Sequence, residues 1–349
     1  MSSQYLAAEW LKKCLIIRFS SIGDIILTTS VIEYLGRASP GCEIHFLTLS
    51  DFAPILRGNR YLSRVILVER DAKLNHLRQL AHELESSGYT VFLDLHNSLR
   101  SRYLRSFLSR ERWAVYRKPR MNRFLLFNLH IDRFGREYDV LTEILKLVDG
   151  HRPNRPAPSP TLYISQQEKE RCRRFLAAFG VEGDFVVAIP GAAWSTKLWL
   201  MEGYVKVLDS VLGIDALPVV ILGGQGDAIC DGVASALPGA VNLKGKTDLR
   251  TSLSILACAA AAIGSDTGLT HGAEAVGTPV VMLTGPTSHE TGARVRDSRS
   301  VELSAGPWCR PCSKNGSRPC YRREQVCMTG IDADRAEVSL RAVLSRRSQ

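Results

Sequence analysis

The chain alternates short apolar runs with longer segments of helical length and mixed polarity. In the first half the apolar runs are Cys14–Phe19, Ile44–Leu47, Val65–Val68 and Val91–Leu95. Short runs of this kind are typical of buried strands, and their alternation with helices is typical of βα units. The pattern therefore predicts an α/β fold built on mainly parallel sheets.

The same alternation starts again in the second half, with apolar runs at Phe185–Ile189, Pro218–Leu222, Ala261–Gly264 and Pro279–Leu283. Between the halves, residues 152–160 contain repeated prolines, which cannot continue a helix and are typical of a stiff connector. We therefore expect two domains, residues 1–157 and 158–349. Ligands of parallel sheets bind at the carboxyl ends of the strands, so we expect the site in a cleft between the domains.

The composition, 45% hydrophobic and 23% charged, is that of an ordinary soluble globular protein. No uncharged apolar run approaches the roughly 18 to 20 residues that cross a bilayer. The N-terminal segment, which contains Glu9, Lys12 and Lys13, lacks the apolar core of a secretory signal. These features predict a cytoplasmic protein.

The formal net charge of +10 predicts an acidic partner, for which nucleic acid, anionic lipid and a phosphorylated sugar are all candidates. Much of the positive charge lies between Arg100 and Arg123, where Glu111 is the single acid. The basic residues of this stretch are Arg100, Arg102, Arg105, Arg110, Arg112, Arg117, Lys118, Arg120 and Arg123. Such a stretch forms either a solvated helix face or a patch for an acidic acceptor or a membrane surface.

Two nucleotide motifs are nearly present, but both fail on spacing. Gly224 and Gly226 begin a dinucleotide fingerprint after a predicted strand, but Ile229 occupies the position of its third glycine. Gly245-Lys246-Thr247 looks like the end of a phosphate loop, but Gly239 lies one residue too far upstream. The sequence therefore argues against a nicotinamide enzyme and against a nucleotide hydrolase.

The segment Ser265–His271 lies where a predicted strand passes into a predicted helix. Asp266, Thr267 and Gly268 occupy this junction, and the free N–H groups of a helix N-terminus suit a diphosphate. Capping of the helix by Asp266 or Thr267 would explain the same residues. The segment alone leaves both interpretations open.

A second junction, after Pro190-Gly191, carries Ser195, Thr196 and Lys197 before a helix expected near Met201. Lys197 is a candidate to hold a phosphate and to stabilise the charge of a departing nucleotide diphosphate. A surface lysine packed between tryptophans is the alternative.

In the first half, Asp24 follows the turn Ser21-Ile22-Gly23 and opens a helix expected over Asp24–Leu35. At the mouth of a cleft this carboxylate could take a proton from an acceptor hydroxyl group. A plain helix cap would have the same sequence.

Taken together, these motifs resemble glycosyltransferase family 9, the ADP-heptose:lipopolysaccharide heptosyltransferases. The resemblance runs over most of the chain. It is carried by Ser-Ile-Gly-Asp at 21–24, Leu-Asp-Leu-His near Asp94, Pro-Gly-Ala with Thr196-Lys197 and Trp199, Leu-Gly-Gly near Gly223, Gly245-Lys246-Thr247, and Asp266-Thr267-Gly268 with His271, followed by Gly-Thr-Pro and Gly-Pro-Thr. The order of these motifs along the chain is specific to the family.

The resemblance implies a GT-B architecture of two facing Rossmann-like domains, with the acceptor in the N-terminal domain and the nucleotide sugar in the C-terminal one. It implies an inverting transfer of heptose from ADP-L-glycero-D-manno-heptose to the inner core of lipopolysaccharide, without a catalytic cofactor. Asp24 would be the general base. The donor would be bound by Ser195, Thr196, Lys197, Asp227, Thr247, Asp266, Thr267, Gly268 and His271, with Asp227 near the ribose and Thr247 near the adenine.

The acceptor implied by the resemblance is the lipid A–Kdo core, which is rich in carboxylates and phosphates. We therefore expect Arg100, Arg120 and Arg123 to bind it, with peripheral contact to the inner membrane and no nucleic-acid partner. Ala192 and Ala193 stand where several relatives carry hydroxyl residues, and Ser195 and Thr196 are candidates to replace them. Another nucleotide sugar, a protein acceptor of the autotransporter type and a noncatalytic polyanion-binding protein remain alternatives.

Four cysteines cluster in a Gly- and Pro-containing loop, 306–330, which is also basic. The spacing of Cys309, Cys312, Cys320 and Cys327 provides a candidate tetrahedral ligand set for structural zinc or iron. Similar insertions occur in relatives that glycosylate autotransporters. The remaining cysteines are scattered, and we expect them to be reduced and inert.

Overall fold

The computed structural model describes residues 11–109, 112–135, 137–149 and 157–346. The chain divides into two compact units: unit 1 comprises Met1–Pro119 and Tyr138–Tyr163, and unit 2 comprises Arg120–Glu137 and Ile164–Gln349. Unit 2 therefore includes a helix, α5 (Arg120–Leu129), that precedes the domain boundary expected at 157/158. Arg110, Glu111 and residues 152–156 lie outside the described residues.

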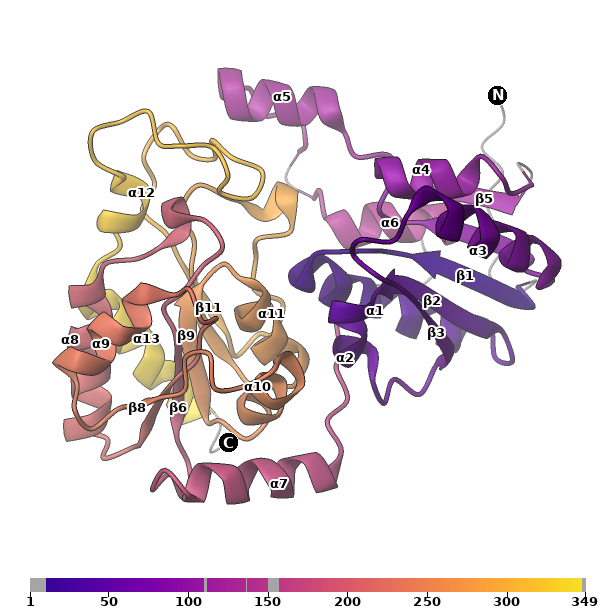
Figure 1. The fold of residues 1–349 in the computed structure, drawn as a ribbon. Helices are drawn as coiled ribbons and strands as arrows, with labels where there is room; N and C mark the ends of the chain where they lie inside the picture. Colours follow the sequence, from indigo (N-terminus) through magenta and orange to yellow (C-terminus); the bar gives the residue numbers. More distant parts are fainter. Residues whose placement is uncertain (1–10, 110–111, 136, 150–156, 347–349) are drawn as a thin grey trace. The chain divides into compact units, whose positions relative to one another are not determined.

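Unit 1 is built on a parallel sheet with the strand order β3-β2-β1-β4-β5 (Figure 1). Its strands are β1 (Lys13–Ile17), β2 (Glu43–Leu49), β3 (Leu62–Val68), β4 (Val91–Asp94) and β5 (Trp113–Val115). The helices are α1 (Ile22–Ala38), α2 (Ala53–Leu56), α3 (Leu74–Ser86), α4 (Leu99–Arg105) and α6 (Val140–Asp149). The four strands expected from the first half are present, and β5 is an additional short edge strand.

Unit 2 contains a second parallel sheet, with the order β11-β10-β9-β6-β7-β8. Its strands are β6 (Val186–Ile189), β7 (Val219–Ile221), β8 (Val241–Asn242), β9 (Ala261–Ser265), β10 (Val280–Leu283) and β11 (Val301–Leu303). Besides α5, its helices are α7 (Gln166–Ala177), α8 (Met201–Gly213), α9 (Ala228–Ala236), α10 (Leu249–Leu256), α11 (Gly268–Ala275), α12 (Val326–Thr329) and α13 (Ala333–Ser345).

The apolar runs form the buried centre of each sheet. In unit 1, Leu15, Ile17 and Phe92 on β1 and β4 pack with residues of α3 and α4. In unit 2, residues of β6, β7, β9 and β10 pack against α8, α9 and α13, which lie on the side of the sheet opposite to α10 and α11 (Figure 1). Strands covered by helices on both faces must be apolar along their length, which explains why continuous apolar runs located them.

In each sheet, the first strands in the sequence extend the sheet to one side and the later strands extend it to the other side. In unit 1 the switch point between the two sides lies between β1 and β4, and in unit 2 it lies between β6 and β9. The loops that follow the two strands diverge there, which leaves room for a ligand at the carboxyl edge of the sheet. The residues singled out from the sequence follow these strands.

No helix among the described residues is long and apolar enough to cross a membrane.

Candidate functional site

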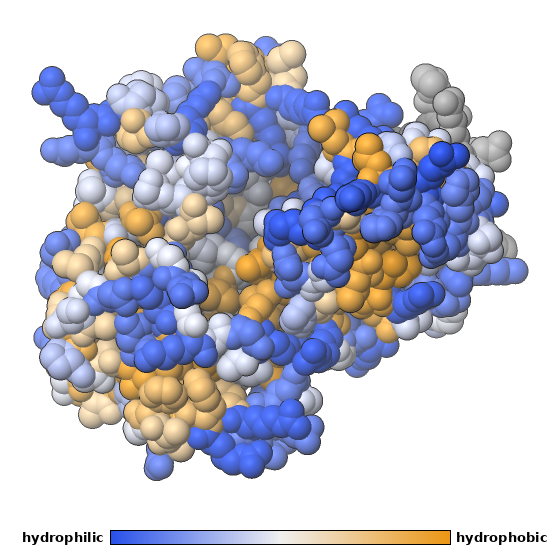
Figure 2. All heavy atoms as spheres, viewed as in Figure 1, coloured by the Kyte–Doolittle hydropathy of each residue, from blue (hydrophilic) through white to orange (hydrophobic). Residues whose placement is uncertain are grey.

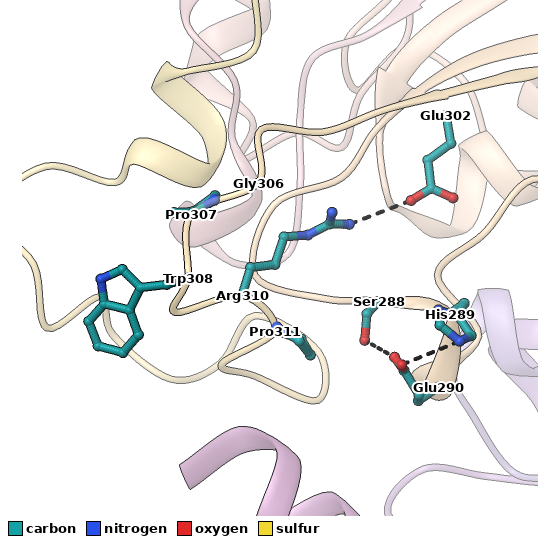
Figure 3. A pocket seen from close by; sticks show the side chains of 9 residues that line it. All are labelled: Ser288, His289, Glu290, Glu302, Gly306, Pro307, Trp308, Arg310 and Pro311. Atoms are coloured by element: carbon teal, nitrogen blue, oxygen red, sulfur yellow. Dashed lines mark hydrogen bonds and ion pairs between the residues drawn. The ribbon is translucent and has the colours of Figure 1, made fainter. Parts of the chain in front are cut away.

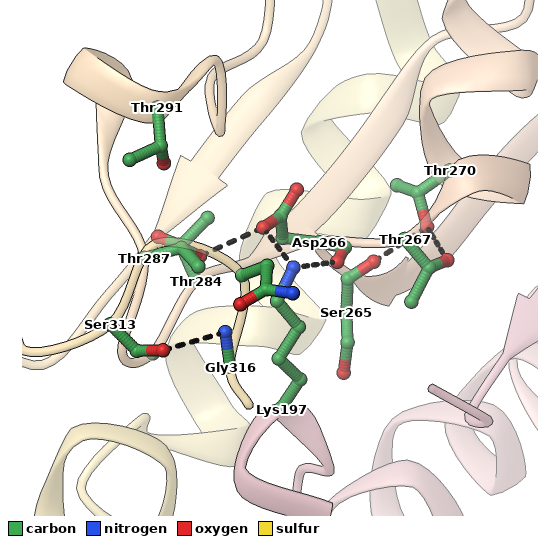
Figure 4. Close-up of polar contacts among 12 residues, drawn as sticks. Lys197, Ser265, Asp266, Thr267, Thr270, Thr284, Thr287, Thr291, Ser313 and Gly316 are labelled. Carbon is green, nitrogen blue, oxygen red and sulfur yellow. Dashed lines mark hydrogen bonds and ion pairs between the residues drawn. The ribbon is translucent and has the colours of Figure 1, made fainter. Parts of the chain in front are cut away.

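The switch point of unit 2 brings Lys197 and Asp266 together, although 69 positions separate them in the chain. Lys197 ends the short 3₁₀ turn Ser195–Lys197 after β6, and Asp266 directly follows β9. The ammonium Nζ of Lys197 lies 2.6 Å from Oδ2 of Asp266 and 2.8 Å from its backbone oxygen (Figure 4). Lys197 is therefore not a free surface lysine, because its side chain is only 13% exposed.

Asp266 is the centre of a cluster of polar side chains. Its Oδ1 lies 2.9 Å from Nε2 of His271, and its Oδ2 accepts a hydrogen bond of 2.8 Å from the hydroxyl group of Thr287. Burial raises the pKa of the Asp266 carboxyl group, but Lys197 and His271 outweigh this effect and hold the pKa well below its usual range. Asp266 is therefore ionised and orients the side chains of Lys197 and His271.

The N-terminus of α11 lies beside this cluster. Thr267 occupies the N-cap position, but its side chain makes no capping hydrogen bond to the helix. Its hydroxyl group instead lies 3.2 Å from that of Thr270 (Figure 4). Because no cap side chain satisfies the N–H groups that begin at Gly268, this helix end suits an anion.

The turn that carries Lys197 is covered by the loop 306–330, which contains the four clustered cysteines. The hydroxyl group of Thr196 donates to the backbone oxygen of Gly316, and the Gln325 amide donates to the backbone oxygen of Thr196. Gly316 has a φ of +89°, and a Cβ atom there would lie 2.9 Å from Cγ of Lys197. Thr196 is thus buried by the loop, whereas Ser195 is exposed and accessible to a ligand.

Asp227 and Thr247 lie farther along the same sheet edge. Asp227, after β7, accepts a hydrogen bond of 2.6 Å from the N–H group of Gly224, and it packs so tightly on Gly191 that a Cβ atom there would meet its Cγ at 2.3 Å. Thr247, after β8, pairs its hydroxyl group with that of Ser252 at 2.8 Å. The strand order thus places both residues on the side of Lys197 that is away from β9.

In unit 1, Asp24 lies in the first turn of α1, next to the switch point. Its Oδ2 lies 2.5 Å from Nη2 of Arg18 and accepts a hydrogen bond of 3.0 Å from the Ser21 hydroxyl group. Ser21 and Asp24 form a capping box, so the capping role and the ion pair exist together. The Asp24 side chain is 45% exposed, which leaves it accessible to a substrate.

The electrostatic surroundings keep Asp24 ionised. Loss of solvation raises its pKa, but the charges of Arg18 and Lys118 and the hydrogen bonds from Ser21 lower the pKa to about 2. Arg18 is itself buried and is fixed by a hydrogen bond of 2.5 Å from Nη1 to the backbone oxygen of Leu95, after β4. The arginine therefore holds the carboxylate at the edge of the sheet.

The three arginines expected to bind the acceptor are divided between the units. Arg100, on α4 of unit 1, donates to the backbone oxygen of Arg70 at 2.7 Å and lies over the ring of Phe19. Arg120 is exposed on α5 of unit 2. Arg123, one turn further along α5, is 9% exposed and donates to the backbone oxygen of Glu290 at 3.3 Å.

The four clustered cysteines lie close enough to affect one another. Burial and the neighbouring thiols raise the pKa of Cys312 to about 11, and they also raise the pKa of Cys327. Nη1 of Arg322 lies 3.6 Å from Sγ of Cys309. Within the described part of the chain, no group of three or more His, Cys, Asp or Glu side chains is arranged to hold a metal ion. The zinc or iron ligand set expected from the spacing stays a prediction.

Two residues of these clusters were not assigned a role from the sequence. Arg18 pairs with Asp24, and its position directly after an apolar strand is the signal that could have identified it. Thr287 belongs to the Gly-Pro-Thr segment of the family resemblance, but its contact with Asp266 depends on the pairing of β9 with β10.

The comparison with protein families identifies the family of the chain. The model of glycosyltransferase family 9 (heptosyltransferase) matches residues 77–321, which is more than half of the chain. The chain belongs to glycosyltransferase family 9. It is therefore a glycosyltransferase, and the two α/β units are the two domains of a GT-B fold.

Curated members of glycosyltransferase family 9 match over most of their length. Lipopolysaccharide heptosyltransferase 1 of Pseudomonas aeruginosa is 25% identical, with 95% of this chain and 98% of the relative covered. Lipooligosaccharide heptosyltransferase 2 of Haemophilus influenzae is 25% identical, with 82% and 87% covered. The match therefore extends over both units.

Solved structures of the family share the fold. A family 9 glycosyltransferase of Veillonella parvula superposes with a TM-score of 0.79 at 18% identity, covering 99% of this chain and all of that one. The ADP-heptose lipopolysaccharide heptosyltransferase II of Escherichia coli gives 0.73 at 21% identity, with 97% and 100% covered. An iron-containing dodecameric glycosyltransferase from enterotoxigenic Escherichia coli gives 0.56 at 13% identity, with 99% and 78% covered.

Proposed function

We propose that this enzyme transfers a heptose from ADP-L-glycero-D-manno-heptose to the inner core of lipopolysaccharide, with inversion at the anomeric carbon. The proposal is supported by the names of its relatives in glycosyltransferase family 9 and, above all, by the Lys197–Asp266 cluster beside the N-terminus of α11. A cation and an uncapped helix N-terminus together suit the diphosphate of a nucleotide sugar.

In the proposed reaction, unit 2 binds the donor. Lys197 and the backbone at Asp266, Thr267 and Gly268 hold the diphosphate, while His271 supports the same cluster. The nucleoside then extends over the loops after β7 and β8, toward Asp227 and Thr247, with Ser195 on the exposed side of the Lys197 turn. The positive charge of Lys197 stabilises the ADP that leaves, because negative charge grows on its phosphate during the reaction.

Unit 1 supplies the base. Asp24 takes the proton of an acceptor hydroxyl group while that oxygen bonds to the anomeric carbon of the heptose and the bond from this carbon to the diphosphate breaks. A single displacement of this kind inverts the anomeric configuration. An ionised and accessible carboxylate suits this role, and Arg18 keeps Asp24 in that state.

The acceptor proposed is a lipid A–Kdo core, whose carboxylates and phosphates are bound by Arg100, Arg120 and Arg123. Such a lipid requires peripheral contact with the cytoplasmic face of the inner membrane. This part of the proposal is supported by α5, where Met121, Phe124 and Leu129 are each more than half exposed next to Arg120. Figure 2 shows orange hydrophobic residues at the top of the view, where Figure 1 places α5.

A donor and acceptor screen tests the proposal. The full-length enzyme is incubated with ADP-heptose or with UDP- and GDP-sugars, in the presence of Kdo–lipid A or of an autotransporter passenger protein. We expect release of ADP from ADP-heptose only with the lipid acceptor, and a product of inverted anomeric configuration. Release of UDP or GDP instead would contradict the donor, and glycosylation of the protein alone would contradict the acceptor.

A further inference from the structure

Unit 2 contains a pocket of about 470 Å³ in the loops that follow β10 and β11 (Figure 3). Ser288, His289 and Glu290 line it from the first loop, and Arg310 lines it from the second, together with Glu302 of β11. Its volume lies within the range of small-molecule sites, about 300 to 1,000 Å³. No residue assigned to the donor or the acceptor above lines this pocket.

The pocket adjoins the cluster proposed to hold the diphosphate. Thr287, which donates its hydroxyl hydrogen to Asp266, directly precedes Ser288 in the pocket wall. A chemical group bonded to a phosphate that binds at Lys197 would therefore lie next to the pocket.

The strand order decides which group this is. Lys197 and Asp266 follow β6 and β9, the nucleoside is assigned to the loops after β7 and β8, and the pocket follows β10 and β11. Along the sheet edge the nucleoside and the pocket thus lie on opposite sides of the diphosphate. The group on the far side of a nucleotide diphosphate is the sugar and the hydroxyl group that attacks it.

The lining has hydrogen-bonding groups of both kinds. The guanidinium group of Arg310 donates, the carboxylates of Glu290 and Glu302 accept, and Ser288 and His289 can do either. In Figure 3 the Arg310 side chain extends toward Glu302, while the Trp308 indole points away from this pair. Ligand hydroxyl groups, which also donate and accept, match such a mixed lining.

The charge of the lining argues against an acidic ligand. The lining contains two carboxylates and one guanidinium group, that of Arg310, which lies 3.5 Å from Oε1 of Glu302. The Glu290 carboxylate is paired with Ser288 and His289 (Figure 3). A phosphate or a carboxylated sugar would meet more negative than positive charge there. A neutral sugar meets no such penalty.

We propose that the pocket holds a neutral pyranose sugar through its hydroxyl groups, an inference that rests on the proposed donor site. The same chemistry is found in the heptose of the donor and in a neutral sugar already present on the acceptor. Glu290 and Glu302 accept from the sugar hydroxyl groups, and Arg310 and His289 donate to them.

Binding is tested by saturation-transfer NMR on the full chain saturated with ADP. The probes are methyl α-D-mannoside, a neutral pyranose, and free Kdo, an acidic sugar. We expect signals from the mannoside that weaken several-fold in His289→Ala and in Glu302→Gln, and weaker signals from Kdo. His76→Ala, an exposed histidine of α3 in unit 1, is the matched control.

Kinetics with the same variants distinguish the two sources of the sugar. A KM for ADP-heptose raised about tenfold, as expected for the loss of one hydrogen bond to a charged group, assigns the pocket to the donor sugar. If instead the KM for the acceptor rises about tenfold, the pocket is assigned to a sugar of the acceptor. Either result supports the inference.

Different results would contradict the inference and the proposed function. If ADP-heptose is not a substrate but the mannoside signals still depend on His289 and Glu302, the pocket is a sugar site and the donor assignment is wrong. If transfer occurs, while both KM values and the mannoside signals are the same in the wild type and in both pocket variants, the inference is overturned.

Discussion

Lys197 and Asp266 share two hydrogen bonds, one from Nζ to the carboxylate and one to the backbone oxygen. An ammonium group has three N–H donors, so one remains for a ligand. The carboxylate thus directs the remaining donor while both groups stay largely buried. This arrangement suits a lysine that must hold an anion in one position.

Lys197→Ala removes that donor. We expect kcat/KM to fall about 10- to 100-fold, which corresponds to the 1.5–3 kcal/mol typical of one hydrogen bond to a charged group. ADP should bind more weakly by a similar factor in calorimetry on the folded variant. Lys206→Ala is the matched control, since Lys206 forms a solvent-exposed ion pair with Asp334. Equal ADP affinities in the wild type and in Lys197→Ala would rule out the phosphate contact.

Asp24→Asn removes the proposed base but keeps the shape of the side chain. We expect kcat to fall about 10²- to 10⁴-fold, the range typical of general-base catalysis. The dissociation constant of ADP should not change, because the proposed donor residues lie in unit 2. Glu143→Gln, which breaks the Glu143–Lys146 pair on α6, is the control for loss of a carboxylate in unit 1. A folded Asp24→Asn enzyme with normal turnover would remove the base role.

Arg18→Gln changes the pH dependence of transfer. Arg18, together with Lys118 and the hydrogen bonds from Ser21, lowers the pKa of Asp24 to about 2, so the wild-type rate should show no loss from this group as the pH falls to about 4. Without the cation the ionised carboxylate is less favoured, and its pKa rises toward the ordinary value of about 3.9 or above. The acid limb of the kcat/KM profile should therefore move to higher pH. Arg18→Lys, which keeps the charge, should restore the wild-type profile, and identical profiles in all three enzymes would disprove the coupling.

Removal of divalent metal should leave transfer unchanged. In the proposed mechanism Lys197 and the α11 N-terminus neutralise the departing diphosphate, and no step requires a metal ion. The initial rate is measured after dialysis against EDTA, with elemental analysis of zinc and iron on the same sample. A loss of turnover that returns only when Mg²⁺ or Zn²⁺ is added would show that the assignment of the diphosphate charge is incomplete.

Exposed apolar residues of α5 should contribute to membrane contact. Phe124→Glu should weaken binding to vesicles that contain anionic lipid about tenfold or more, because about 2 kcal/mol of apolar burial is lost and a negative charge is added. Co-sedimentation measures the effect. Val338→Glu on α13, at a residue that is 68% exposed, is the matched control. Equal binding by the two variants would exclude α5 as the contact.

The sequence predicted the central strands well because each is covered on both faces and must be apolar along its length. Short edge strands such as β8 and β11 escaped prediction for the opposite reason. β8 and β11 contain only a few residues, and Asn242 and Glu302 interrupt their apolar character. The place of α5 in unit 2 also could not be predicted, since it depends on contacts such as that of Arg123 with Glu290.

The position of several candidate residues at the junction of a strand and a helix was predictable, because local sequence determines that geometry. The starts of α1 and α11 show in the sequence as Gly23-Asp24 and Asp266-Thr267-Gly268. The partners were harder to predict, because Thr287 and Gly316 reach the Lys197 cluster only through strand pairing and loop packing. Cysteine spacing suggested metal ligands, and this stays a prediction, because the fold of the loop, and not the spacing alone, decides where its thiols point.

Asp266 joins three segments that are distant in the sequence, the Lys197 turn, helix α11 through His271 and the loop after β10 through Thr287. Removing the carboxylate would release all three at once, and loss of one partner from a buried ion pair typically costs about 3 to 5 kcal/mol. The same side chain thus stabilises the packing of these three segments at this end of the sheet. Attempts to re-engineer the donor preference are therefore better directed at the loops after β7 and β8, where substitutions leave the contacts of Asp266 intact.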